Sequence, residues 1–156
     1  MKAAWNLLQK ITTIIVLASA MTAPTLAQNA DAIEYKKISK LISSTYDQPH
    51  HKVETAPISI ANDFAIADWV QGEKGGRALL RRSQGKWEIM VCGGDGLKDL
   101  NALGNAGINK ATAQALVTQL NTAEKSLTAE RVKRFGLFGT TIDDHHAGQK
   151  TPNSHP

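Results

Sequence analysis

Three short apolar runs lie between Phe64 and Asp95, and glycine-bearing turns separate them. The runs are rich in β-branched, aromatic and aliphatic residues, and the turns fall at Gly72–Gly76 and Ser83–Lys86. Runs of this length and composition, punctuated by glycine, are typical of consecutive antiparallel strands. The pattern therefore predicts a three-stranded β-meander.

Alternation within the meander predicts its two faces. In the first strand the even-numbered side chains from Phe64 to Asp68 share one face, and the odd-numbered ones at 65–69 share the other. In the last strand Trp87, Ile89 and Val91 are predicted to point one way, and Glu88, Met90 and Cys92 the other. One face is expected to carry a helix, and C-terminal segments are expected to cover part of the other face or leave it concave.

The segments before the meander predict a helix and an edge strand. Apolar residues recur at spacings of three and four over Asp31–Tyr46, which indicates a helix lying across the sheet, with Asp31 as its N-cap. Val53–Ala61 has a β pattern, but Pro57 removes one donor from the ladder. This stretch is therefore predicted to be an edge strand or an extended approach to the sheet.

Helical patterns follow the meander. Asp95 is predicted to cap a helix over residues 96–103, Asn109 to cap a second one reaching Lys125, and Thr128 to open a short third one through Phe135. The predicted fold class is α+β, with an N-terminal helix packed on a curved antiparallel meander of three to four strands and two to three C-terminal helices. Cystatin-like and nuclear-transport-factor-like half-cones are the nearest analogies, and such an analogy does not fix function.

The N-terminal residues predict export. Lys2 and Lys10 precede a short apolar segment, and the segment after it ends in Thr25-Leu26-Ala27, which has small or tolerated residues where signal peptidase cleaves. Residues 1–27 are therefore predicted to be a signal peptide. An uncleaved anchor is the alternative, but the apolar segment is shorter than the roughly 20 residues that cross a bilayer. Residues 28–142 are then a single domain, and residues 143–156 a His-containing tail predicted to be disordered.

The charge argues against a nucleic-acid partner. The full chain carries +4, and the predicted signal peptide contributes two lysines and no acid, which leaves about +2 for the mature chain. The sequence has neither a basic block nor aromatic residues interleaved with basic ones. We therefore expect no nucleic acid among the partners.

Catalytic patterns are missing from the sequence. Gly72–Gly76 lies between two strands with no helix after it, which indicates a hairpin turn rather than a phosphate-binding loop. Cys92 is the single cysteine, and the five histidines fall in a loop and a tail that would not hold an imidazole rigidly against it. A non-enzymatic role is therefore predicted.

Metal binding has more support from residue chemistry. Met90 and Cys92 are two residues apart on a predicted strand, and a thioether and a thiolate are soft ligands that suit Cu(I). His145 and His146, preceded by two aspartates, offer imidazoles for Cu(II), zinc or nickel. The same residues also fit ordinary core filling and a solvated tail, so both interpretations stay open.

A different set of residues suits a ligand other than a metal. Asp68, Trp69, Arg77 and Trp87 lie on the predicted meander, where they are candidates for binding a small molecule or a peptide in a concave sheet face. The alternative prediction is therefore a binding module of cystatin-like or nuclear-transport-factor-like type without metal.

The motif over residues 68–82, followed by Gly85-Lys86-Trp87 and by residues 91–99, resembles the copper uptake system-associated proteins, which are small exported proteins of Gram-negative bacteria. The resemblance covers roughly residues 60–120 and extends to the layout of signal peptide, helix, glycine-rich meander ending in a cysteine, helices and His-containing tail. It implies a periplasmic accessory to copper acquisition, with copper as cofactor and other copper-uptake proteins as possible partners. Cys92 is the matching position for a copper ligand.

Overall fold

The computed structural model describes residues 26–139 of the chain. Its elements are α1 Leu26–Tyr46, β1 Glu54–Ala61, β2 Phe64–Gln71, β3 Lys74–Ser83, β4 Lys86–Gly93, the 3₁₀ helix η1 Asp95–Lys98, α2 Leu100–Asn105, α3 Lys110–Glu124 and α4 Ala129–Phe135. The predicted α+β fold class is confirmed. The predicted tail 143–156 lies outside the described residues, as does the predicted signal peptide except for its last two residues, which begin α1.

The sheet is a four-stranded antiparallel meander in the order β1-β2-β3-β4. β1 is an edge strand, as predicted, and its pairing with β2 shifts register around Pro57. The β3–β4 hairpin turns at Gln84 and Gly85, which both have positive φ, as a tight two-residue hairpin requires. At the β2–β3 turn only Gly72 has positive φ, and Gly75 lies inside β3, so this turn is shorter than predicted.

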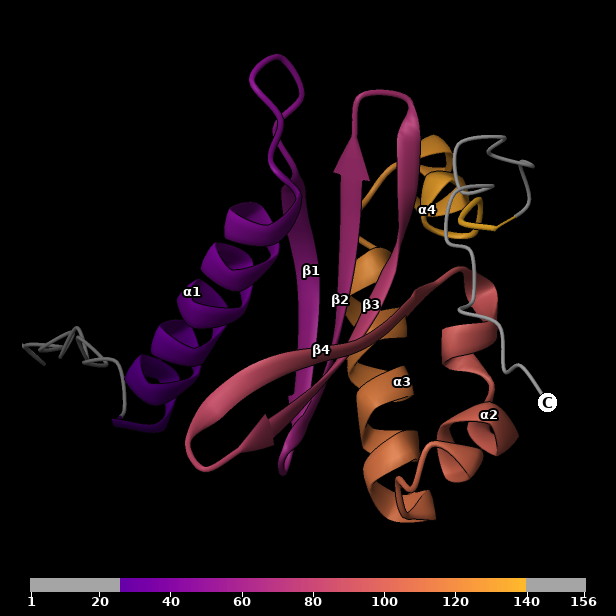
Figure 1. Cartoon of the computed structure of the whole chain (residues 1–156). Helices are drawn as coiled ribbons and strands as arrows, with labels where there is room; N and C mark the ends of the chain where they lie inside the picture. The colour runs from indigo at the N-terminus through magenta and orange to yellow at the C-terminus, as the bar shows by residue number, and fades with distance from the viewer. Residues whose placement is uncertain (1–25, 140–156) are drawn as a thin grey trace, which may run out of the picture.

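Helices cover both faces of the sheet (Figure 1). α1 packs on one face, where Ile38 and Ile42 join a core with Ala65, Ala67 and Leu80. α2 and α3 pack on the opposite face, where the core residues are Ile66, Leu79, Leu103, Ile108, Ala113, Leu116 and Leu120. The predicted division of the β2 side chains between two faces is confirmed.

The alternation predicted for β4 is wrong beyond its middle. Leu80 pairs with Ile89 and Leu79 pairs with Val91, so Met90 is an extra residue in a β-bulge. Because of this extra residue, Cys92 pairs with Ala78 and packs against the α1-side core that also contains Ile89. The thiol therefore faces the helix α1 and not the opposite layer.

Two of the four predicted helix caps are wrong and two are confirmed. Asp31 lies inside α1, which begins at Leu26. The helix predicted over residues 96–103 is η1 followed by α2, and Asp99 caps α2 by accepting from the Ala102 backbone N–H at 2.8 Å. Asn109 and Thr128 cap α3 and α4 as predicted. Within the described part of the chain, no helix combines the length and the apolar character that crossing a bilayer requires.

Candidate functional site

A cavity of about 340 Å³ lies on the α1 side of the sheet, next to the C-terminal end of α1. Residues from α1, the approach to β1, three strands and the segment after α4 form its walls: Tyr46, Val53, Trp69, Gln71, Lys74, Cys92 and Phe138. The walls are mostly aromatic and aliphatic, and the thiol of Cys92 is among their few polar groups. This cavity is the candidate site.

The Cys92 thiol is free and half-buried in the cavity wall. Its Sγ lies 3.8 Å from the Tyr46 hydroxyl oxygen, within hydrogen-bond distance for sulfur, and either group can donate. Burial raises the pKa of Cys92, and the Tyr46 hydroxyl partly opposes that rise. At neutral pH the site therefore offers a thiol, which has to lose its proton before it can ligate a metal.

We predict that Cys92 reacts with iodoacetamide at a rate whose pH midpoint lies above that of free cysteine. The reacting species is the thiolate, and burial disfavours that charged form. Tyr46→Phe is expected to move the midpoint higher still, because it removes the hydroxyl that lowers the pKa of Cys92. Alkylation rates between pH 7 and 11, read by mass spectrometry on this single-cysteine chain, measure both. A midpoint at or below that of free cysteine would contradict the burial described here.

Trp69 and Phe138 make an edge-to-face pair on another wall of the cavity. Their ring centroids are 5.8 Å apart and their planes meet at 78°. Gly76 permits this arrangement, because a Cβ there would lie 2.7 Å from Cζ2 of Trp69 and 2.9 Å from Cβ of Phe138. The cavity wall thus depends on a missing side chain in β3.

The predicted metal ligands are only partly brought together. Met90 is exposed and, with Cys92, borders a groove along β4. His51 is exposed in the α1–β1 connection. Among residues 26–139, no group of three or more His, Cys, Asp or Glu side chains is placed to hold a metal ion. His145 and His146 lie outside the described residues.

Asp68 and Arg77 lie on the other face of the sheet and are fully buried. They are directly opposite each other on β2 and β3, and Nε of Arg77 is 3.2 Å from Oδ1 of Asp68. The two side chains therefore lie against each other inside the protein, on the face of the sheet opposite the cavity.

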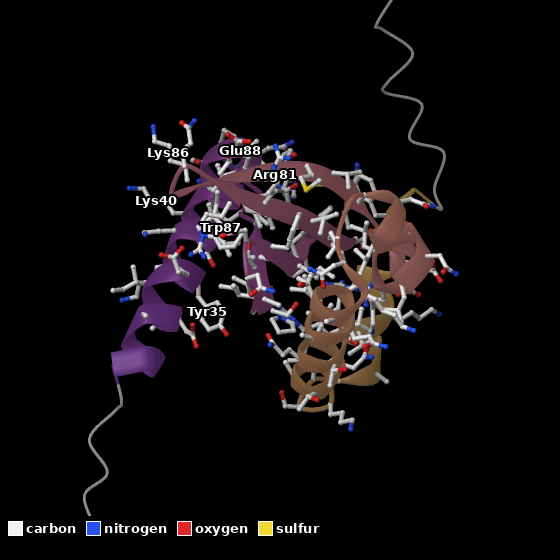
Figure 2. The ribbon with its side chains drawn as sticks, turned by 90° about the horizontal axis from the view of Figure 1, so that it is seen from below. Tyr35, Lys40, Arg81, Lys86, Trp87 and Glu88 are labelled. Carbon is white, nitrogen blue, oxygen red and sulfur yellow. The ribbon has the colours of Figure 1, made fainter. Side chains whose placement is uncertain are left out.

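Trp87 lies under α1, at the hairpin end of the sheet (Figure 2). Its indole N–H donates to Oε2 of Glu34 at 2.6 Å, and the Arg82 guanidinium lies 5.4 Å from its ring centroid. These contacts hold α1 to the β3–β4 hairpin. Asp68, Trp69, Arg77 and Trp87 therefore do not line one common surface.

Sequence reasoning missed three residues that shape these sites. Tyr46 fits the apolar periodicity at the end of α1, and that pattern does not reveal that its hydroxyl is the hydrogen-bond partner of Cys92. Phe138 lies in a stretch without periodicity and gave no signal. Glu124 gave one, because it continues the four-residue spacing of Leu116 and Leu120 and is buried like them.

Comparison of the chain with protein-family models, with curated proteins and with solved structures finds no match.

Proposed function

We propose that this protein is a periplasmic copper-handling accessory protein that binds copper without catalysing a reaction. One observation carries the proposal: Cys92 and Phe138 line the same cavity. His145 and His146 follow Phe138 by seven and eight residues in the sequence. At roughly 3.3 Å per residue, a chain of this length reaches at most about 23 Å, which is long enough for these imidazoles to join the thiol at one metal ion.

The chemistry of these groups favours copper. A thiolate and the thioether of Met90 are soft donors for Cu(I), and imidazoles bind both oxidation states. Met90 and Cys92 border the same groove along β4, although the β-bulge breaks the simple alternation between them. The resemblance to the copper uptake system-associated proteins supports the same metal and suggests other periplasmic copper-uptake proteins as partners.

Removing the thiol is the sharpest test. We expect Cys92→Ser to weaken Cu(I) binding by the chain from residue 28 onward at least about tenfold, because a hydroxyl is a poor ligand for a soft cation. Truncation after Gly139 is expected to weaken binding as well, because it removes His145 and His146. Titration against a competing Cu(I) chelator measures both effects.

The control is the double variant His50→Ala, His51→Ala, which removes two imidazoles from the exposed α1–β1 connection, whereas the truncation removes three, at His145, His146 and His155. It is expected to keep the affinity of the unmodified chain. If Cys92→Ser binds Cu(I) as tightly as that chain does, the proposed ligand is wrong.

A second candidate function is the binding of a small apolar molecule in the same cavity. Its volume of about 340 Å³ falls in the range of ligand pockets, and its walls are mostly aromatic and aliphatic. Trp69→Ala tests this second function. If the cavity is an organic-ligand site, the substitution should weaken binding of an apolar fluorescent dye and leave the Cu(I) affinity unchanged.

A further inference from the structure

A cluster of charged groups lies on the α3 face of the sheet, away from the cavity. At its centre Arg77 is fully buried, and its Nη2 lies 2.8 Å from Oε1 of Glu124 at the end of α3. Its Nη1 lies 2.8 Å from Oδ1 of Asp95 in η1. Lys98, also in η1, lies 2.6 Å from the other Glu124 oxygen. The cluster therefore connects β3, η1 and α3.

Asp68 is the member of this cluster with the fewest partners. It is fully buried, and neither of its carboxyl oxygens has a hydrogen bond among the described residues. Nε of Arg77 is 3.2 Å away, but it too has no hydrogen bond. A buried carboxylate without hydrogen bonds is far costlier than a buried neutral carboxyl group.

The balance of charge points the same way. The groups that face Asp68 are Arg77 from β3 and Glu124 from α3, with Asp95 and Lys98 joined to them from η1. Glu124 already accepts hydrogen bonds from both Arg77 and Lys98. An ionised Asp68 would therefore place a second negative charge next to the same cations, at an Arg77 Nε with which it forms no hydrogen bond.

We propose that Asp68 holds a proton in the folded protein at neutral pH, and that loss of this proton in mild alkali loosens the junction of β3, η1 and α3. The proposal is independent of copper binding. Loosening of this junction would also reach the cavity wall. Oδ2 of Asp95 lies only 2.6 Å from the position that a Cβ on Gly136 would occupy, so Asp95 is packed closely against the segment that carries Phe138 two residues later. The fold would thus sense the pH outside the cytoplasm, where the chain is proposed to act.

The direction of the pH effect follows from the two states of Asp68. Burial raises its pKa from 3.8 to about 8, against the lowering effect of Arg77 and with a further rise from Glu124. Between these values the folded state binds a proton that the unfolded chain does not hold. The stabilisation that this bound proton gives the folded state is complete below about pH 4 and is lost as the pH rises through about 8. Between these two values the folding equilibrium constant falls by up to about tenfold per pH unit.

Carboxyl ¹³C NMR of the Cys92→Ser chain tests the proposal, since this background removes the titration of the thiol. We expect one aspartate carboxyl to titrate with a midpoint near pH 8 and to be missing in Asp68→Asn. Backbone amide shifts of residues 95–98 and of Glu124 should follow the same midpoint in the Cys92→Ser chain, and should not do so when that chain also carries Asp68→Asn. A midpoint below pH 5 for Asp68 would overturn the proposal, and this measurement does not require the Asp68→Asn chain to fold.

Urea unfolding between pH 5 and 9 gives an independent measurement. The unfolding free energy of Asp68→Asn, relative to the parent chain, is expected to rise with pH and level off above about pH 8. Asp31→Asn is the control, because Asp31 is exposed on α1, and its difference from the parent chain should not change over this range. Parallel pH dependences for the parent and Asp68→Asn chains would also overturn the proposal.

Discussion

Arg77→Met is expected to lower the free energy of unfolding by about 3–5 kcal/mol at pH 7, the loss typical of breaking one side of a buried ion pair. Methionine keeps most of the volume of the side chain but supplies no charge to Glu124, which is almost fully buried. It also removes the guanidinium that lies 5.7 Å from the ring centroid of Phe135. Urea unfolding followed by circular dichroism measures the loss.

Arg81→Met is the matched control, because Arg81 lies four residues along the same strand with half of its side chain exposed. Its nearest acid is Glu88, at 4.0 Å, and exposed pairs of this kind contribute at most about 1 kcal/mol. The penalty of Arg77→Met should also shrink at pH 4, because loss of the Arg77 hydrogen bond raises the pKa of Glu124, which then takes up a proton more readily. Equal losses for the two variants would show that the buried cluster does not stabilise the fold.

The faces of β2 could be predicted because strand alternation is a local property. The bulge in β4 could not, because the register is decided by how Leu79 and Leu80 pair, and Met90 itself gives no signal of its position. The orientation of Cys92 depends on that bulge. Because of this single extra residue, Cys92 shares a face of the sheet with Trp87 and Ile89, whereas strict alternation predicts the opposite face.

The helix caps illustrate a second limit. Asp95 and Asp99 both precede apolar positions, so both fit the pattern of an N-cap. Asp99 takes that role in the structure, whereas Asp95 accepts a hydrogen bond from Arg77 at 2.8 Å. The choice depends on a partner 18 residues earlier in the chain, which local sequence patterns do not reveal.

Long-range packing also explains what was missed at the candidate site. Arg77, Arg81 and Arg82 all lie on the strand next to Asp68, and the register of β2 with β3 places Arg77 opposite it. The contact between Cys92 and Tyr46 joins residues 46 positions apart, and it exists because α1 packs beside β4. Residues such as these are found from the packed structure and not from spacing.

Gly94→Ala is expected to lower the free energy of unfolding by about 1–3 kcal/mol, as overpacking typically does. A Cβ at this position would lie 2.5 Å from the carbonyl oxygen of Gly136 and 3.2 Å from that of Phe138. Because these are backbone atoms, the segment after α4 has to move as a whole, and Phe138 then shifts away from Trp69. Urea unfolding gives the loss, and fluorescence of the chain from residue 28 onward with Trp87→Phe, in which Trp69 is the single tryptophan, reports the altered ring contact.

Gly104→Ala provides the matched control for that prediction, since a Cβ there meets no atom within 4 Å. Gly104 lies inside α2, where alanine is favoured over glycine, so this change should raise the free energy of unfolding by about 0.5–1 kcal/mol. The two substitutions add the same methyl group and should act in opposite directions. If Gly94→Ala leaves both stability and Trp69 fluorescence unchanged, the segment carrying Phe138 does not pack against the end of β4, and the link between Cys92 and the C-terminal histidines loses its structural basis.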